Sequence, residues 1–207
     1  MHHAMVVSCN AYFAQLAVAI GPDALSRTAA AAGITVNASR STARIRANLP
    51  HAGYGQGEVL LTPLRLARVT AALGTDGMIR ESPLFVRASE ASASSAPTSA
   101  FPREVIETPF VSPDSAKVLA GYLRDAVTNG TGRQLKDHPA RIAGKTGTAE
   151  VDEAAPHAWF TGFAPYGPAT RRIAFAVVLE HAGYGGAAAA NVAGQIVTAA
   201  AAMGLAK

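Results

Sequence analysis

A single lysine stands among glycines and threonines in the segment of the sequence with the clearest chemical potential. Residues 143–150 read Ala-Gly-Lys-Thr-Gly-Thr-Ala-Glu, with Lys145 near the centre. The lysine offers a positive charge, Thr146 and Thr148 offer hydroxyl groups, and Gly147 lets a ligand approach the backbone closely. These groups together predict a site that binds an anionic ligand.

Two kinds of anion site contain such a triplet. Gly144, Lys145 and Thr146 match the second half of a phosphate-binding loop, which also needs a glycine five residues earlier and an apolar helix afterwards. Pro139 occupies the place of that glycine, and residues 151–156 read as a loop, so the sequence excludes the phosphate loop. The remaining interpretation is the Lys-Thr-Gly triplet of the penicillin-recognising serine enzymes.

A serine and an asparagine near the start of the chain form a second group of candidates. Ser8 and Asn10 flank Cys9 and stand directly before an apolar stripe at helical spacing, which Gly21 and Pro22 end. The stripe consists of Tyr12, Phe13, Leu16, Ala17 and Ile20. Taken alone, these residues predict that Ser8 or Asn10 caps the helix. Cys9 is expected to be small and buried.

Three strand-like segments at the end of the chain must position the lysine. They cover residues 142–149, 157–164 and 173–180, and the connections between them are too short for a parallel crossover, which predicts an antiparallel meander. Trp159 and Phe160 are expected to lie in the core. The third strand is apolar on both faces, so the sequence predicts an α+β fold whose antiparallel sheet is covered by helices on both faces.

Helices are predicted along the rest of the chain. Two carry a hydroxyl cap followed by proline, starting at Thr62 and Ser112, and end near Gly74 and Asn129. A further helix is predicted from Asp23 to Ala32. The alanine-rich stretch from Ala187 to Met203 is too weakly apolar for a membrane span, and is expected to be a helix that covers one face of the sheet.

The segments between these helices are expected to be irregular. Residues 34–50 are polar and irregular, and the glycine-rich residues 53–57 are interpreted as flexible packing. Residues 90–100 are low in complexity and predict a mobile surface loop, flanked by strand signals at 84–86 and 104–106. The single domain therefore divides into a mainly helical region, a variable insertion with a helix, and the meander with its helix, at residues 1–83, 84–140 and 141–207.

Composition narrows the function classes. The chain has 207 residues, of which 49% are apolar and 15% charged, as expected for one folded domain with a sizeable core. The net charge of +4 comes without a basic cluster interleaved with aromatic residues, so no nucleic-acid partner is predicted. One cysteine excludes an internal disulfide, and the six histidines lack ligand spacing, so neither a metal nor a cofactor is predicted.

Together these segments resemble the transpeptidase domain of penicillin-binding proteins, especially the monofunctional type of cell division and elongation. The resemblance rests on Ser8-Cys9-Asn10, on residues 55–57 and 62–67, on residues 145–150, and on residues 157–165. It implies serine acyl transfer that cross-links peptidoglycan stem peptides, with β-lactams as inhibitors. It also implies the cell envelope, at the extracytoplasmic face of the inner membrane, with a membrane anchor upstream and possible division or elongation partners.

The resemblance assigns roles to the candidate residues. Lys145 would attract the carboxylate of the stem peptide or of a β-lactam, and Thr146 and Thr148 would offer it their hydroxyls. Gly147 would let the ligand lie beside the strand, and the Thr148 amide would be one of two oxyanion donors.

The pair near the start of the chain receives two further roles. Ser8 would relay a proton to the leaving amine. Asn10 would hold the substrate amide and the lysine of the nucleophile motif.

The sequence departs from the family in one important respect. The nucleophile motif Ser-x-x-Lys is absent, because Asp114, Arg133, Ile142 and Gly204 stand three residues before the four lysines. We therefore expect the first strands and the nucleophile helix to lie upstream, and this chain alone to be inactive. A non-catalytic binding or regulatory module is the alternative. A β-lactamase-like hydrolase is disfavoured, since no obvious acidic loop residue for deacylation is present.

Overall fold

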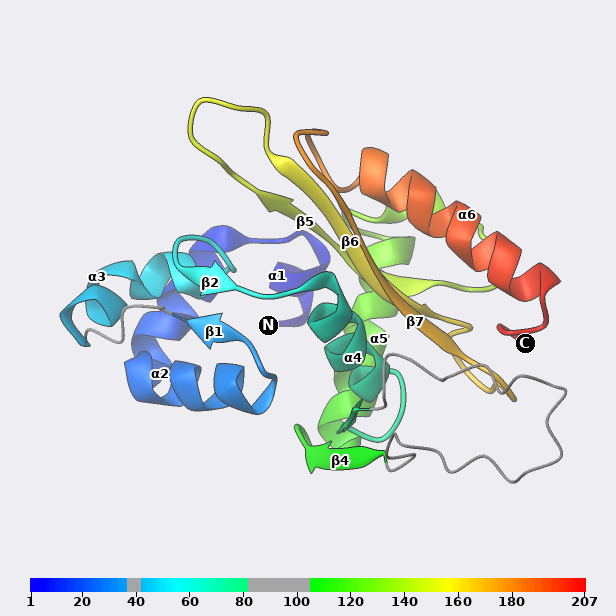
Figure 1. The fold of residues 1–207 in the computed structure, drawn as a ribbon, viewed down its shortest axis with the longest axis horizontal. Coiled ribbons are helices and arrows are strands. Elements are labelled where there is room, and N and C mark those ends of the chain that lie inside the picture. The colour runs from blue at the N-terminus through cyan, green and yellow to red at the C-terminus, as the bar shows by residue number, and fades with distance from the viewer. Residues whose placement is uncertain (37–41, 82–104) are drawn as a thin grey trace, which may run out of the picture.

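The structure is a computed structural model that describes residues 1–36, 42–81 and 105–207 (Figure 1). Its helices are α1 (His2–Val6), α2 (Asn10–Ala31), α3 (Thr42–Ala52), α4 (Pro63–Leu73), α5 (Pro113–Thr128), the 3-10 turn η1 (Arg133–Leu135) and α6 (Ala188–Ala202). Its strands are β1 (Thr35–Val36), β2 (Val59–Leu60), β3 (Met78–Glu81), β4 (Ile106–Pro109), β5 (Ala143–Ala149), β6 (His157–Ala164) and β7 (Ile173–Leu179).

The predicted meander is confirmed. Strands β5, β6 and β7 form a sheet in that order, and both pairs are antiparallel. Lys145 lies opposite Thr161, and Gly147 lies opposite Trp159. The lysine segment is thus an outer strand of the sheet.

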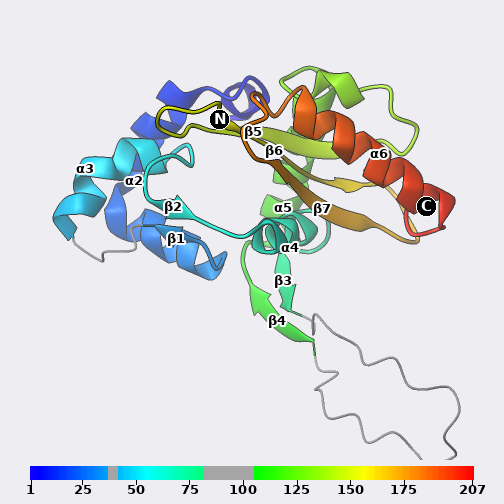
Figure 2. The ribbon, with the colours of Figure 1, turned by 45° about the horizontal axis from the view of Figure 1, so that its top comes forward.

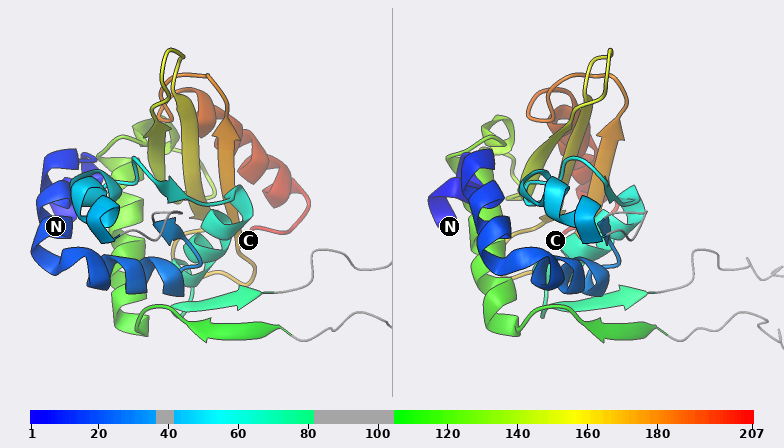
Figure 3. Two further views of the ribbon diagram at one scale, coloured as in Figure 1. Left: turned by 60° about the vertical axis from the view of Figure 1, so that its left-hand side comes forward. Right: turned by 90° about the vertical axis from the view of Figure 1, so that its left-hand side faces the viewer.

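Helices cover both faces of this sheet, as the sequence predicts. Phe160 and Phe175 are buried on one face in a cluster with Val197 of α6. Phe163 is buried on the other face with Leu123 of α5, and Leu73 of α4 packs against this cluster. Figure 3 shows α6 and α5 on opposite sides of the strands. The α+β architecture follows directly, because neither face of the sheet is left to solvent.

The two predicted hydroxyl caps are present. The Thr62 hydroxyl accepts a hydrogen bond from the Arg65 amide, and the Ser112 hydroxyl accepts one from the Ser115 amide, both at 3.2 Å. Proline occupies the first turn of each helix, where no amide hydrogen is needed. These helices support the sheet face that carries Phe163.

The helical region differs from the prediction in one place. Gly21, with φ of 81° and ψ of 166°, breaks the helical conformation within α2, so α2 consists of two helical parts joined at a kink, as Gly21 and Pro22 predict. Residues 34–50 are expected to be irregular, but β1 pairs with β2 and α3 packs against α2, on either side of residues 37–41, which lie outside the described residues. Among the α3 side chains that the structure describes, only Leu49 is buried, so tertiary contacts form this helix in spite of its polar sequence.

The middle of the chain is described only in part. The predicted strand 84–86 and loop 90–100 lie outside the described residues. The strand signal at 104–106 overlaps β4 at Ile106. This strand pairs with β3 and projects away from the three-stranded sheet (Figure 2). Among the described segments, no helix has both the length and the apolar character needed to cross a bilayer.

Candidate functional site

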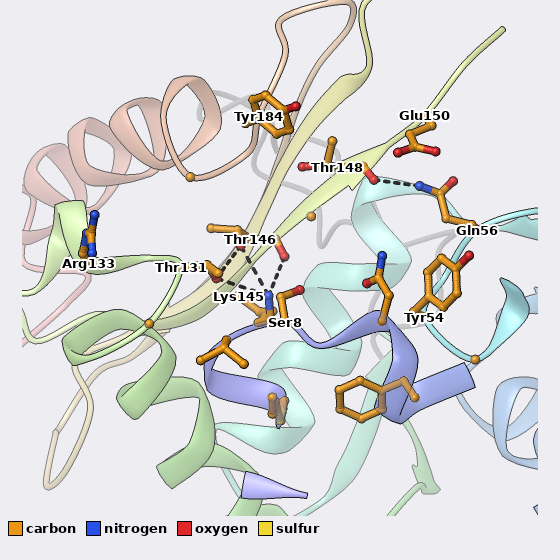
Figure 4. A pocket seen from close by; sticks show the side chains of 18 of the residues that line it. Ser8, Tyr54, Gln56, Thr131, Arg133, Lys145, Thr146, Thr148, Glu150 and Tyr184 are labelled. Atoms are coloured by element: carbon orange, nitrogen blue, oxygen red, sulfur yellow. Dashed lines mark hydrogen bonds between the residues drawn. The ribbon is translucent and has the colours of Figure 1, made fainter. Parts of the chain in front are cut away.

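A cavity of about 910 Å³ lies against β5 (Figure 4). Its other walls are the start of α2, the turn at residues 53–57 and the turn at residues 129–133. The six predicted site residues all line it: Ser8, Asn10, Lys145, Thr146, Gly147 and Thr148. The fold therefore brings together two groups that stand more than a hundred residues apart in the sequence.

Lys145 is held by neutral oxygens. Its Nζ atom donates to the Thr146 carbonyl at 3.0 Å, and to the Thr131 and Thr146 hydroxyls at 3.3 Å each. Burial lowers the pKa of Lys145 to about 8, since water is displaced from the charged form. No carboxylate of the described chain forms an ion pair with it, so its charge is available to an anionic ligand.

Thr131 is a site residue that the sequence analysis missed. Its hydroxyl accepts a hydrogen bond from the Thr146 hydroxyl at 2.7 Å as well as the one from Lys145. The turn that carries it packs on α1, where the Thr131 amide donates to the Val6 carbonyl at 3.3 Å. The local sequence Asn-Gly-Thr after α5 predicts the end of the helix but not the contact with Lys145.

The outer edge of β5 faces the cavity. Gln56 Nε2 donates to the Thr148 carbonyl at 2.9 Å, and Lys145 Nζ donates to the Thr146 carbonyl. Both carbonyls therefore point away from β6. In an antiparallel strand the amide and carbonyl of one residue point to the same side. The Thr148 amide accordingly points toward the cavity, which is the direction that an oxyanion donor needs.

Ser8 and Asn10 do not cap α2. The cap position is Cys9, and no side chain makes a capping hydrogen bond there, so that prediction is wrong. Ser8 instead has φ of 57°, in the left-handed region that is costly for a residue with a side chain. In the part of the chain that the structure describes, no hydrogen bond occupies the Ser8 hydroxyl or the Asn10 amide.

The glycine-rich turn at residues 53–57 forms a wall of the cavity. Gly53 approaches the Phe13 carbonyl and Ala17 so closely that a side chain has no room there. Gln56 from this turn holds the edge of β5. Gly53 therefore allows the turn to pack closely against α2, and the flexibility of the turn stays a prediction.

Trp159 and Phe160 have different environments. Phe160 is fully buried, as predicted. Trp159 is only half-buried and lines a second cavity of about 400 Å³, which also contacts Ala149 and Leu66. The prediction of a core position is wrong for Trp159, since alternate residues of β6 face opposite sides of the sheet.

The loop before α6 packs directly against the lysine segment. Gly185 lies against the backbone of Gly147 and Trp159, with no room for a side chain. Gly186 lies against Thr131 and Thr146. The backbone of β5 is therefore supported directly at the residues that line the cavity.

Charged groups are unevenly placed around the cavity. Arg133, Lys145 and Glu150 line it, and Figure 4 shows Arg133 and Glu150 on opposite sides of Lys145. Within residues 1–36, 42–81 and 105–207, no group of three or more histidine, cysteine or acidic residues is placed to hold a metal ion. The chemistry that the cavity offers is therefore two cations, one carboxylate, hydroxyls and backbone amides.

Comparison with known proteins gives similar sequences and folds. The chain is 32% identical over 161 residues to the peptidoglycan D,D-transpeptidase MrdA of Haemophilus influenzae, and this match covers 70% of the chain and 24% of the relative. It is 31% identical over 219 residues to the peptidoglycan D,D-transpeptidase PbpA of Mycolicibacterium smegmatis, and this match covers 97% of the chain and 43% of the relative. The chain thus spans less than half the length of either relative.

Solved structures show the same fold. The D,D-transpeptidase domain of a peptidoglycan glycosyltransferase from Eggerthella lenta matches with a TM-score of 0.75 and 25% identity, over 99% of this chain and 54% of the other. PBPA from Mycobacterium tuberculosis matches with a TM-score of 0.72 and 28% identity, over 94% of this chain and 47% of the other. Residues 1–198 also match the penicillin binding protein transpeptidase domain as a family. The chain belongs to the family of penicillin-binding protein transpeptidase domains.

Proposed function

We propose that this chain provides the carboxylate-binding and oxyanion-binding side of a peptidoglycan D,D-transpeptidase site. The observation that carries the proposal is Lys145, a half-buried cation held only by neutral oxygens on the open edge of β5. The carboxylate of a peptide can pair with the Lys145 ammonium, and the main chain of the peptide can form hydrogen bonds with the backbone groups on the outer edge of β5. Strand addition of this kind gives affinity through the main chain.

The proposed reaction begins when a serine oxygen adds to the carbonyl carbon between the two terminal D-alanines of a stem peptide. The Thr148 amide donates to the oxyanion, a contribution worth roughly 10²–10³ in rate. The carbon–nitrogen bond then breaks, and Ser8 relays a proton to the departing D-alanine amine. An amine of a neighbouring strand then attacks the ester carbonyl. A new carbon–nitrogen bond forms as the bond to the serine oxygen breaks, and the proton that the amine loses restores the serine hydroxyl. Asn10 holds the substrate amide during both steps.

The nucleophile motif of this reaction is absent from the 207 residues. No Ser-x-x-Lys occurs in the sequence, and we propose that the chain alone forms no acyl-enzyme. The same fact supports the alternative of a non-catalytic module that binds stem peptides. In either case we propose that the site acts in the cell envelope, on the extracytoplasmic face of the inner membrane, alongside division or elongation proteins.

Intact mass after incubation with benzylpenicillin tests the missing nucleophile. We expect no increase in mass for folded protein. A single stable adduct would show that a nucleophile is present within the chain. It would overturn the proposal that the chain alone is inactive.

Peptide binding tests the carboxylate site itself. We expect Nα,Nε-diacetyl-L-Lys-D-Ala-D-Ala to bind, and Lys145→Met to weaken binding about 10-fold or more, because a charge-assisted hydrogen bond is lost. Lys136→Met is the matched control, since Lys136 is exposed and does not line the cavity. Equal binding by the Lys145→Met protein would contradict the proposed carboxylate site.

A further inference from the structure

Side chains already occupy two carbonyls on the outer edge of β5. Gln56 Nε2 donates to the Thr148 carbonyl at 2.9 Å, and Lys145 Nζ donates to the Thr146 carbonyl at 3.0 Å. Figure 4 shows the Gln56 amide reaching the end of the strand. In the part of the chain that the structure describes, no group outside the sheet accepts from the Thr146 or Thr148 amide. The edge therefore offers donors to a ligand while its acceptors are occupied.

An occupied carbonyl opposes the addition of a strand. A strand that joins an antiparallel sheet uses both kinds of backbone group, because each hydrogen-bonded pair of residues exchanges two N–H···O bonds. An edge whose acceptors are covered is protected from pairing with unrelated strands. The same cover opposes a substrate whose main chain must enter this place.

The proposed reaction identifies the substrate group that meets Gln56. A terminal carboxylate near Lys145 makes the peptide run antiparallel to β5. The carbonyl that accepts from the Thr148 amide belongs to the second residue from the carboxylate end. In an antiparallel pair the amide of that same residue faces the Thr148 carbonyl. The peptide amide and the Gln56 side-chain amide therefore approach one oxygen atom.

The Gln56 side chain is free to leave this oxygen. It is half-buried, and within residues 1–36, 42–81 and 105–207 it makes no other hydrogen bond. The backbone amide of Gln56 donates to the His51 carbonyl at 3.0 Å, which holds the turn independently of the side chain. Side-chain rotation at a partly exposed position is fast. Displacement thus requires the loss of one hydrogen bond and no rearrangement of the turn.

We propose that Gln56 is a gating residue, which occupies the Thr148 carbonyl in the free site and is displaced by the amide of the second residue from the carboxylate end of a bound peptide. This inference rests on the proposed function of the site. Gln56 takes no part in bond making. It lowers the affinity for a peptide that pairs fully with β5, because one hydrogen bond is exchanged for another rather than gained.

Two ligands that differ in one amide test the competition. Nα,Nε-diacetyl-L-Lys-D-Ala-D-Ala carries the amide, and the depsipeptide in which D-lactate replaces the first of the two D-alanines has an ester oxygen in its place. Gln56→Met keeps a side chain of similar length and removes the donor. We expect Gln56→Met to bind the peptide about five-fold more tightly than the unaltered protein does, and the depsipeptide with unchanged affinity.

The four dissociation constants, from NMR titrations, form a double-mutant cycle that isolates the coupling between Gln56 and the peptide amide. Gln134→Met is the matched control, since Gln134 is exposed and lines neither cavity. It should leave both affinities unchanged. The unaltered protein provides a second measurement, because the peptide should shift the NMR signals of the Gln56 side-chain amide and the depsipeptide should not.

The outcomes separate this inference from the proposed function. If Gln56→Met binds the peptide no more tightly, the Thr148 carbonyl accepts from both groups through its two lone pairs, and the competition is wrong. Weaker binding of both ligands would also overturn it, because Gln56 would then support the site. In both cases the carboxylate site stands. If neither ligand binds any of the proteins, the proposed function fails and the gating role fails with it.

Discussion

The two walls of the larger cavity differ in how their polar groups are held. On the β5 wall, Lys145 and Thr146 stand on a sheet that is covered on both faces, and hydrogen bonds join them to Thr131 of the neighbouring turn. On the opposite wall, Ser8 and Asn10 have no hydrogen bond to their side chains in the described parts of the chain, and Ser8 occupies the left-handed region.

This difference separates two physical tasks. The β5 wall holds a charge in a fixed place, which costs desolvation but requires no rearrangement when a ligand arrives. The Ser8 wall exposes a hydroxyl and an amide that make no hydrogen bond within the described parts of the chain, and it stores backbone strain of about 1–3 kcal/mol. Electrostatic perturbations should therefore act on the first wall, and backbone perturbations on the second.

The largest expected effect is the pH dependence of the β5 wall. Only charged Lys145 binds a carboxylate, so affinity for Nα,Nε-diacetyl-L-Lys-D-Ala-D-Ala should fall about 10-fold or more as pH rises through about 8. The free energy of unfolding should change in the opposite direction. The folded protein releases the proton near pH 8 and the unfolded chain near 10.5, so Lys145 makes stability rise between these values.

Paired measurements check these opposite signs. Peptide titrations and urea unfolding are carried out over the same pH range. Subtracting the Lys145→Met profiles isolates the contribution of this lysine from those of other groups. A Lys145-dependent affinity that stays constant through pH 8 would show that its charge is not the ligand-binding group.

A smaller effect is expected at the bridge between Lys145 and Thr146. Thr131→Val removes the hydroxyl that accepts from both residues, and should lower the free energy of unfolding by about 1 kcal/mol. It should also lower the pKa of Lys145 further, because the Thr131 hydroxyl stabilises the charged ammonium and the valine does not. Urea unfolding and NMR titration of the lysine measure the two effects. Thr131→Ser keeps the hydroxyl and should restore both, whereas an unchanged lysine pKa in Thr131→Val would contradict the bridging role.

The smallest effect is expected on the other wall. Ser8→Gly relieves the left-handed strain at φ of 57°, and should raise the free energy of unfolding by up to about 1 kcal/mol. Ser8→Ala removes the same hydroxyl but keeps the strain, so it is the matched control. Chemical denaturation compares the two variants. Equal stability of both would mean that Ser8 carries no strain.

The sheet and its supporting helices were predictable because their signals are local. Alternating apolar residues and short connections indicate the meander, and Thr62 and Ser112 are hydroxyl caps directly before a proline. The polar helix α3 was not predictable in this way, since it forms through packing on α2. Local patterns predict an element well when its own residues supply most of its stability.

The site was predictable only in its separate motifs. Lys145 and Ser8 stand in recognisable triplets. Thr131, by contrast, lies 14 residues from Lys145 and 15 from Thr146, and Gln56 lies 92 residues from Thr148. Their contacts depend on how two turns pack against α1 and α2, and nothing in their local sequence specifies that packing. The partners that hold a functional group are therefore harder to predict than the group itself.

The contact of Gly185 with Gly147 and Trp159 has a mechanical consequence. Because the loop before α6 contacts the backbone of β5 without an intervening side chain, β5 cannot shift toward this loop unless the loop and α6 move with it. We therefore expect changes in the width of the cavity to come from movement of the α1–α2 side, which carries Ser8, while β5 stays in place.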